Sequence, residues 1–465
     1  MYEFFHLMKA ELAVTAIIFL LLFIKIGKGM KNEILLPILQ TVLLLNFIGG
    51  FLGNTTGHLF GDMFYTTPLI SFEKNILNLG VYLISLFCTD WFKKSNHLAE
   101  YFLLMLAALL GMFFLISAGN LLIFYLALEL ATIPVAAMAN FDLQKKSSSE
   151  GAMKLILSSA FSSGILLFGI SLLYGSTGTL SFALIPAQLD GSALQILAFV
   201  FFLSAFAFKL SIVPFHLWTA DVYEGSPVAT ASFLSVISKG AIAFILMSTL
   251  YYVFQPLLDI WYNFLIILAV LTMLIGNLFA IRQQNIKRFL AFSSIAQVGF
   301  ILVGISGGQE MGTSAVVYFV LIYVFSNLAA FGVAAIISDS TGKENIDDYK
   351  GLYKTNPLIS WILALSLFSL AGIPPTAGFF GKLFLLQAGA DRGSYIFITI
   401  AALNMIISLY YYLRIIRAVF MEENESPIAK INVNKYAKLA MYICGAGILF
   451  TGIFSLIYEY IHSLH

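Results

Sequence analysis

The sequence predicts an all-α polytopic membrane protein with about fourteen transmembrane helices. Of its 465 residues, 60% are hydrophobic and only 11% are charged, with a mean hydropathy of +0.93, whereas soluble domains carry about 25% charged residues. Segments such as 101–116 are apolar on every face, while the strands of a membrane barrel alternate apolar and polar residues. Composition therefore excludes a soluble enzyme, and the pattern favours membrane helices over a barrel.

A spanning helix needs about 20 mostly apolar residues, and fourteen segments meet this requirement in order along the chain. Residues 1–98 hold three spans, at 8–28, 33–53 and 75–92. Five follow at 99–117, 119–139, 151–174, 191–215 and 227–252, then five at 260–281, 287–306, 312–338, 357–388 and 395–420, and the last at 437–461. The first is expected to be a retained span, because no small-residue cleavage site follows a short apolar region.

The segments between the spans are short, so no extramembrane domain is expected. A nucleotide, flavin or iron–sulfur site should therefore belong to another chain. The two cysteines, Cys88 and Cys444, fall in separate predicted spans and cannot form a four-cysteine cluster site. The formal net charge of +1 gives no electrostatic footprint for nucleic acid. We expect no cofactor and no metal site in this chain.

The basic residues predict the orientation of the helices. The chain has 25 Lys and Arg residues, and four of them lie inside predicted spans. Only Lys9, Lys74 and Arg392 lie on the side of the membrane where the loops after even-numbered spans are expected. All the others, Lys25 and Lys28 among them, fall on the opposite side. Because cytoplasmic loops are enriched in Lys and Arg, we expect odd-numbered loops in the cytoplasm and both termini outside it.

Two spans carry sequences that break helices. Span 7 contains FKLSIVPFHLW, with Pro214 five residues after Lys209, and span 12 contains AGIPPTAGFFGK in a segment too long for one straight crossing. Proline clashes with the carbonyl four residues earlier, so the carbonyls of Leu210, Leu370 and Ala371 are expected to be free. Within a membrane such groups persist only when buried in protein or facing water.

The spacing of the two broken spans predicts an internal repeat. Spans 7 and 12 are five apart, and five is odd, so two five-helix units are expected to be related by inversion across the membrane. The units are spans 4–8, at residues 99–252, and spans 9–13, at residues 260–421, followed by the C-terminal helix at 437–461. Paired broken helices in inverted repeats mark the ion pathway of transporters.

Four charged side chains are predicted deep within the apolar bundle: Glu129, Lys209, Lys239 and Lys382. A charge at the bilayer centre costs about 2.5–3.5 kcal/mol, so each should have a partner or a function. Burial favours the neutral form of a lysine amine, and a nearby carboxylate favours its ammonium form. The proton affinity of a buried lysine therefore changes when its carboxylate partner moves. The alternatives are a structural ion pair for Glu129 and snorkelling for the lysines. Their central positions and the helix breaks favour proton conduction, without excluding sodium.

Three further residues are candidates for an accessory role. Glu150 and Lys154 lie four apart near the start of span 6, either as a surface ion pair worth about 0.2–0.5 kcal/mol or as an entry point for protons. His216 follows the break in span 7 and either relays protons or satisfies broken backbone. Asp221 and Glu224 are interpreted as ordinary solvated loop acids.

Four motifs resemble the antiporter-like subunits of the proton-pumping NADH–quinone oxidoreductase, respiratory complex I. They are FKLSIVPFHLWTADVYEGSPV, the lysine in VISKGAIAF, RQQNIKRFLAFSSIAQVGFILVG and SLAGIPPTAGFFGKLFLL. The resemblance runs from about span 4 to span 13. Within the family the chain is most similar to the subunit N group, because no lateral helix follows span 14 and Lys382 stands where the middle subunit usually has glutamate. Gln297 departs from the family pattern, since many relatives have histidine there.

The resemblance implies a role for each candidate. Glu129 and Lys209 match the pair of spans 5 and 7, Lys239 the central lysine of span 8, and Lys382 the lysine that ends the half-channel. The accessory candidates match a cytoplasmic-side pair, Glu150 and Lys154, and a histidine of the broken helix, His216. The implied activity is proton translocation by one membrane-arm subunit of a translocase in the bacterial inner membrane. NADH, FMN, iron–sulfur clusters and quinone are then bound by partner subunits, and other antiporter-like subunits are neighbours.

Three other functions are weighed against this one. The D-type subunit of a multisubunit sodium–proton antiporter shares the fold and many of the motifs. An independent solute symporter predicts a polar pocket at the membrane midplane, whereas this sequence offers spaced charges. A purely structural scaffold leaves the buried lysines without an explanation.

Overall fold

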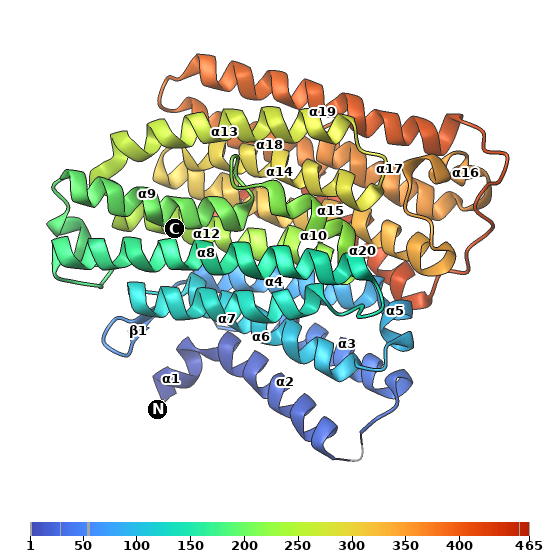
Figure 1. The fold of residues 1–465 in the computed structure, drawn as a ribbon, viewed down its shortest axis with the longest axis horizontal. Coiled ribbons are helices and arrows are strands. Elements are labelled where there is room, and N and C mark those ends of the chain that lie inside the picture. The colour runs from blue at the N-terminus through green and yellow to red at the C-terminus, as the bar shows by residue number, and fades with distance from the viewer. Residues whose placement is uncertain (1, 28, 54–55, 455, 465) are drawn as a thin grey trace.

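The computed structural model describes residues 2–27, 29–53, 56–454 and 456–464. Lys28, which the topology prediction counts, and the terminal residues Met1 and His465 lie outside the described residues. The helices run nearly parallel to one another, with α1 and α2 at one edge of the bundle and α19 at the opposite edge (Figure 1). This arrangement confirms an all-α polytopic membrane fold.

The N-terminal region holds five helices and a small hairpin. Its elements are α1 (Tyr2–Leu7), α2 (Lys9–Ile26), α3 (Asn32–Gly49), β1 (Gly57–Leu59), β2 (Phe64–Thr66), α4 (Pro68–Phe87) and α5 (Thr89–Lys94). The antiparallel pair β1–β2 sets His58 opposite Tyr65. This hairpin is absent from the predicted spans because it lies in the connection between two of them.

The middle of the chain runs from α6 to η3. Its elements are α6 (Leu98–Ile116), α7 (Leu121–Ala139), α8 (Lys146–Thr177), η1 (Ile185–Gln188), α9 (Ala193–Leu210), α10 (Leu217–Gly225), α11 (Val228–Ser232), η2 (Phe233–Ser238), α12 (Lys239–Ser248) and η3 (Thr249–Val253). The last four follow one another without a gap, with π-helical turns at η2 and η3. We call them together the 228–253 helix.

The rest of the chain runs from η4 to α21. Its elements are η4 (Gln255–Leu257), α13 (Leu258–Ile281), α14 (Ile286–Ile305), α15 (Gln309–Thr341), η5 (Ile346–Tyr349), α16 (Leu352–Thr355), α17 (Pro357–Ala371), α18 (Ala377–Ala390), α19 (Tyr395–Met421), α20 (Lys435–Ile453) and α21 (Leu456–His462). Over the described residues, 12 helical segments are long and apolar enough to cross a membrane. The helix α2 and the pair α17–α18 correspond to the other two predicted spans.

The boundaries differ from the prediction in two informative places. Helix α4 begins at Pro68 rather than at residue 75, because the side chain of Thr67 caps it by accepting a hydrogen bond from the Ile70 N–H at 3.2 Å. The extra two turns carry Glu73 and Lys74 into the helix, so Lys74 is not the loop residue that the topology prediction assumed. At the other end of the chain, α20 ends at Ile453 and α21 is a separate short helix.

Both predicted helix breaks are confirmed. Helix α9 ends at Leu210, and Ser211 takes a left-handed conformation with φ 62° before α10 begins. Helix α17 ends at Ala371, and Gly372 has φ 85° before α18 begins. Glycine adopts positive φ without steric cost, whereas Ser211 is a non-glycine residue held there by its surroundings.

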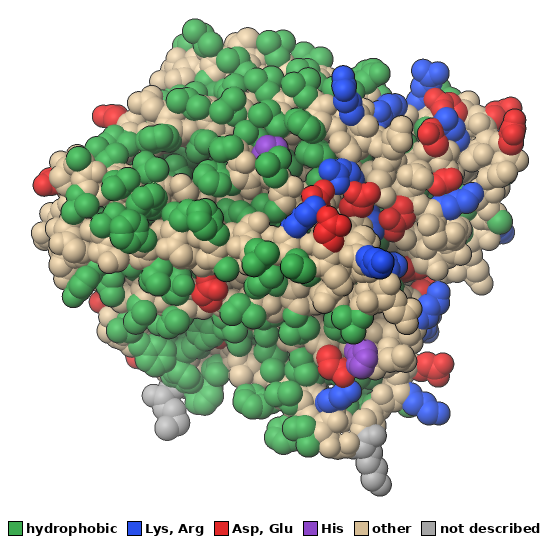
Figure 2. Space-filling view, in the orientation of Figure 1, with side chains coloured by type: hydrophobic (Ala, Val, Ile, Leu, Met, Phe, Trp, Pro, Cys, Tyr) green, Lys and Arg blue, Asp and Glu red, His purple; other side chains and the backbone are tan. Residues whose placement is uncertain are grey.

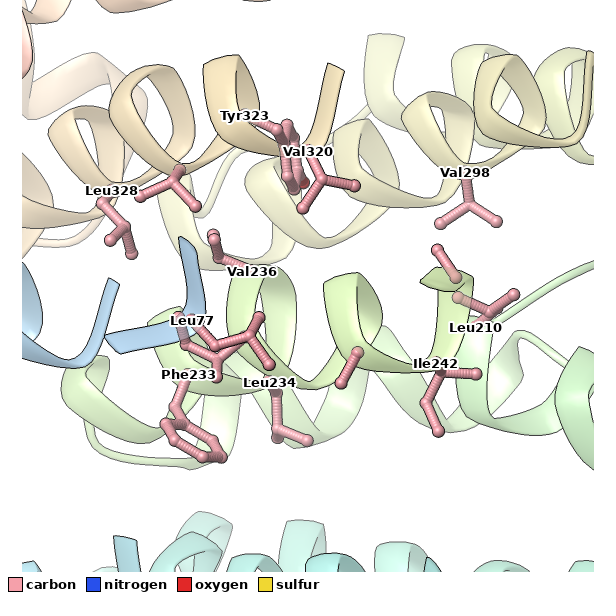
Figure 3. Close-up of a cluster of buried hydrophobic side chains, with 14 of the residues drawn as sticks. Leu77, Leu210, Phe233, Leu234, Val236, Ile242, Val298, Val320, Tyr323 and Leu328 are labelled. Atoms are coloured by element: carbon pink, nitrogen blue, oxygen red, sulfur yellow. The ribbon is translucent and has the colours of Figure 1, made fainter. Parts of the chain in front are cut away.

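The most buried helices meet at the centre of the bundle. Helix α15 packs against α4, α17, α18 and α20, and α14 packs against α13 and α18. Leu77 of α4 lies beside Val236 and Phe233 of the 228–253 helix, facing Val320 and Leu328 of α15 across the cluster (Figure 3). Apolar packing on all sides of these helices leaves few places for charged groups, and the site below occupies those places.

Charged side chains are unevenly distributed along the helices. On the face drawn in Figure 2, Lys and Arg side chains gather at the end of the bundle where α5 and α16 lie. The rest of that face is largely apolar, as expected for a surface in contact with lipid.

Candidate functional site

The first predicted lysine lies at the end of a broken helix and is bound by two hydroxyl groups. Lys209 precedes the last residue of α9. Its Nζ donates to Thr132 Oγ1 of α7 at 2.5 Å and to Ser159 Oγ of α8 at 2.8 Å. Three helices therefore converge on one ammonium group at the first break.

Glu129 lies one turn before Thr132 on α7, at a distance from Lys209. Its Oε1 is buried and has no hydrogen-bond partner among the described residues. The Glu129 carboxylate and the Lys209 ammonium are more than 4.0 Å apart, since no ion pair joins them. The pair expected from the sequence is therefore a separated one, and the hydroxyls hold the ammonium.

A small cavity extends from Lys209 toward the 228–253 helix. Its volume is about 30 Å³, and its wall includes Thr132, Lys209, Trp218 and Ser238. A buried water needs about 10–15 Å³ of such space and two to four polar partners. The cavity thus has room for one or two waters between Lys209 and Ser238, the residue before Lys239.

Lys239 follows the π-helical turn η2 and is only 2% exposed. Its Nζ donates to Ser294 Oγ of α14 at 2.8 Å and lies 5.7 Å from the centre of the Tyr223 ring. A π-helical turn re-aims the side chains around it and is frequent at functional sites. The lysine predicted to be central is therefore buried where the 228–253 helix meets α14.

A chain of polar contacts runs from α14 to the second helix break. Ser293, next to Ser294, shares a hydrogen bond of 2.6 Å with the Tyr412 hydroxyl of α19. Gln297 donates from Nε2 to the Tyr412 hydroxyl at 3.0 Å and to the Leu370 carbonyl at 2.9 Å. The position that departs from the family pattern is thus a bridge between α19 and the end of α17.

Lys382 is the last residue in this series of polar contacts. It is 1% exposed, and its Nζ donates to the Leu370 carbonyl at 2.7 Å and to the Ala371 carbonyl at 3.4 Å. These are the two carbonyls predicted to be free because Pro374 and Pro375 follow them. Gly378 permits the close approach of α18 to α17, since a Cβ there would meet the Ser369 carbonyl oxygen at 1.7 Å.

The accessory pair belongs to a larger ionic network. Lys154 contacts Glu150 at 2.7 Å and Asp221 at 2.7 Å, and Arg288 contacts Asp221 at 2.7 Å and Glu224 at 2.8 Å. The interpretation of Asp221 and Glu224 as solvated loop acids is wrong, because both lie on α10 and both bind Arg288 of α14. Figure 2 shows such charges gathered over α8 and α10.

His216 stands apart from these contacts. It precedes α10, is buried, and its Nδ1 has no hydrogen-bond partner among the described residues. Its ring lies 6.4 Å from that of Phe279. The structure places it beside the first break without joining it to Lys209 or to the ionic network.

Sequence reasoning missed the charged groups of α4. Lys74 contacts Glu11 of α2 at 2.5 Å and donates to Ser117 Oγ at 2.6 Å, and all three are buried. Glu73 is buried beside them. The signal available was the spacing of Thr67 and Pro68, a helix start, which would have placed both charges inside a span.

Within the described ranges, no group of three or more His, Cys, Asp or Glu side chains is placed to hold a metal ion. The candidate site offers the amines of Lys209, Lys239 and Lys382, the Glu129 carboxylate and the hydroxyl groups near them.

Comparison with known proteins shows where the similarity lies. The family model described as "NADH:quinone oxidoreductase/Mrp antiporter, TM" matches residues 118–408. NADH-quinone oxidoreductase subunit N of Phocaeicola vulgatus is 46% identical over 456 residues, which cover 97% of this chain and 97% of that protein. The subunit N of Moorella thermoacetica is 39% identical over 381 residues, covering 81% of this chain and 80% of that protein.

Solved structures agree with this similarity. A chain of the respiratory complex I from Thermus thermophilus with bound aureothin has a TM-score of 0.82 at 27% identity, covering 96% of this chain and 97% of that one. A chain of the Mrp complex from Dietzia has a TM-score of 0.84 at 21% identity, covering 98% and 96%. At that identity the second match shows a shared fold only.

Proposed function

Because the chain belongs to the NADH:quinone oxidoreductase/Mrp antiporter transmembrane family, as a subunit N of the NADH–quinone oxidoreductase membrane arm, we propose that Glu129, Lys209, Lys239 and Lys382 form its proton relay. Redox chemistry belongs to partner subunits, which bind NADH, FMN, iron–sulfur clusters and quinone. This chain contributes a path for protons and the charged groups whose changing interactions move protons along it.

One observation carries the proposal: a small cavity and a set of polar side chains lie between the three lysines, within otherwise apolar helices. The small cavity joins Lys209 to the start of the Lys239 helix. Ser294, Ser293, Tyr412 and Gln297 lead from Lys239 toward Lys382. Buried polar groups are costly unless they are satisfied, so a row of them through a membrane protein is best explained by conduction.

The steps follow from the groups present. Movement of Glu129, or neutralisation of its charge by a neighbouring subunit, weakens the hold of Lys209 on its proton. The proton passes through water in the small cavity to Lys239. From there the serine hydroxyls and Tyr412 lead it to Lys382. Gln297 cannot titrate, so it orients Tyr412 and the Leu370 carbonyl while the proton moves on water or the phenol.

We place Glu150, Lys154 and His216 on the path with a smaller role. The Lys154 network is partly exposed at the end of α8 and α10 and suits proton entry. His216, buried beside the first break, suits an exchange with water near Lys209. Both roles are separable from the lysine relay by substitution.

We also propose the membrane arrangement expected from the sequence. Residues 99–252 and 260–421 form two units related by inversion, preceded by the helices of 1–98 and followed by the helix of 437–461. The gathering of Lys and Arg at one end of the bundle supports odd-numbered loops in the cytoplasm. Both termini then face the periplasm of a bacterial inner membrane. A reporter active only in the cytoplasm, fused after His465, should be silent, and an active reporter would reverse the assignment.

The test of the relay is Lys239→Ala in the assembled complex. Removing a positioned proton-transfer group lowers rates by about 100-fold or more, so proton translocation driven by NADH in vesicles should fall at least to that extent. The matched control is Lys354→Ala, since Lys354 is exposed and pairs with exposed Glu423, whose pKa it lowers through a hydrogen bond. Normal pumping by an assembled Lys239→Ala complex would overturn the proposal.

The sodium–proton antiporter alternative lacks a comparable observation. The similarity to the Mrp complex extends to the fold only, whereas identity to subunit N relatives covers nearly the whole chain.

A further inference from the structure

A large cavity lies outside the relay, at the end of the bundle near the β1–β2 hairpin. Its volume is about 650 Å³. The wall is built by the hairpin, the start of α4 and the end of the 228–253 helix. Among its lining side chains are Tyr65, Glu73, Ser248, Tyr251 and Tyr252. No step of the proposed relay uses this space.

Glu73 is the buried charge of this cavity. The residue is 1% exposed and lies in the first turns of α4. Among the described residues it forms no hydrogen bond and no ion pair, because its neighbour Lys74 is engaged by Glu11 and Ser117. An isolated carboxylate removed from water is strongly disfavoured. A cavity large enough for water is the environment that lets it take up and lose a proton.

The cavity reaches the surface at a second titratable pair. His58 and Asp62 line it and contact each other at 3.3 Å, with side chains that are 60% and 68% exposed. The wall also includes Tyr65, Tyr252 and Ser248, among mostly apolar side chains such as Ile70 and Met247. One cavity thus contains both a buried carboxyl group and exposed titratable groups.

Helix α4, which carries Glu73, packs against the helix of the central lysine. Leu77, one turn further along α4, packs against Gly240, the residue after Lys239; a Cβ at Gly240 would lie 3.5 Å from Leu77 Cδ2. Figure 3 shows Leu77 beside the 228–253 helix. One helical turn is about 5.4 Å. Glu73 therefore lies about one turn from the level of Lys239, on the side of the large cavity.

We propose that Glu73 is a proton-release residue that connects the level of Lys239 to the large cavity. The Glu73 carboxylate accepts a proton from the Lys239 ammonium and becomes a neutral acid, while Lys239 becomes a neutral amine. It then gives the proton to water in the cavity, which restores the carboxylate, and the proton leaves past His58 and Asp62. The inference rests on the proposed function and on the predicted orientation, in which the start of α4 faces outside.

The first experiment compares Glu73→Gln with a matched acid at the same end of the bundle. Asp259, at the start of α13, is exposed and does not line the cavity. In vesicles containing the assembled complex, Glu73→Gln should lower NADH-driven proton release by about 100-fold, the lower end of what a positioned group contributes. Asp259→Asn should leave it unchanged. Wild-type release by an assembled Glu73→Gln complex would overturn the inference.

A chemical rescue separates proton release from a structural role. The native cysteines are both buried, so Glu73→Cys supplies a single thiol at the cavity. Iodoacetate then restores a carboxylate at this position, while iodoacetamide adds a neutral amide of similar size. Proton release should recover with iodoacetate and stay low with iodoacetamide. Equal recovery, or no recovery with either reagent, would show that the charge at Glu73 only supports the fold.

A membrane-impermeant thiol reagent tests the direction of the passage. The thiol of Glu73→Cys should react when the reagent is on the outer side of the membrane and should resist it on the inner side. Reaction from the inner side alone, or from neither side, would overturn the assignment of the cavity as an outward passage.

The two proposals fail in different ways. If Lys239→Ala stops pumping and Glu73→Gln does not, the relay stands and the release role of Glu73 is wrong. If both variants pump normally, the proposed function itself is wrong.

Discussion

The two helix breaks hold the same kind of residue in different chemistry. At the first break, Lys209 is bound by the hydroxyls of Thr132 and Ser159, with Glu129 at a distance. At the second, Lys382 is bound by the carbonyls of Leu370 and Ala371. A hydroxyl both donates and accepts hydrogen bonds, whereas a carbonyl only accepts.

This difference assigns separate tasks to the two lysines. Hydroxyls can bind either the ammonium or the neutral amine of Lys209, so its protonation can follow the position of Glu129. Carbonyls at the C-terminal end of α17 favour a positive charge, as the helix dipole does there, so Lys382 holds a proton until the path beyond it opens. Within the proposed relay, the first break is therefore an adjustable site and the second a retaining site.

The largest effect is expected at the retaining site. Lys382→Ala leaves buried carbonyls short of donors, at a cost of about 1–3 kcal/mol, and should abolish pumping. Lys382→Arg keeps the charge but cannot deprotonate, so it should preserve assembly and still block proton uptake in vesicles. If the Lys382→Arg complex pumps as wild type does, Lys382 only neutralises charge and the retaining role is wrong.

The next largest effect is expected from Glu129→Gln at the adjustable site. Without the carboxylate, Lys209 holds its proton less firmly, and a change of one unit in proton affinity is tenfold. Pumping should fall by about tenfold while the complex still assembles, because one neutral amide is tolerated in a bundle with polar cavities. Glu33→Gln, at an exposed position on α3, is the control. Normal pumping by Glu129→Gln would leave Glu129 with a structural role.

Gln297→Glu tests the comparison by giving the second break a carboxylate like that of the first. A carboxylate near Lys382 strengthens its hold on the proton, so turnover should fall several-fold without loss of assembled complex. Gln297→His keeps a donor for the Leu370 carbonyl and adds a titratable group, so it should pump. If Gln297→Glu and wild type turn over equally fast, a nearby carboxylate does not change how firmly Lys382 holds its proton, and the proposed difference between the two breaks is wrong.

The smallest effect is expected from the hydroxyls of the first break. Ser159→Ala removes one of two partners of Lys209, which should cost about 1 kcal/mol and slow pumping only slightly. The neighbouring Ser158→Ala is the control, since Ser158 makes no contact with Lys209. Thermal unfolding of the purified complex and initial pumping rates measure both effects. A tenfold loss in Ser159→Ala would make the hydroxyl a relay member rather than a ligand.

Local composition determined a large part of this protein. The order of the main apolar helices follows from hydropathy, which each segment carries independently of its neighbours. The breaks at Leu210 and Ala371 follow from prolines, because the steric clash of a proline acts within one turn. The carbonyls that bind Lys382 could be named from the sequence for the same reason.

The tertiary structure alone decided which groups meet. The hydroxyls around Lys209 come from α7 and α8, Asp221 binds Arg288 across α10 and α14, and Glu11 pairs with Lys74 from α2 to α4. Nothing in the local pattern fixes these contacts, because they depend on the rotation and depth at which each helix packs against the others. The cavity beside Glu73 has the same origin. It is a space that remains because the hairpin, α4 and the 228–253 helix do not pack tightly together there.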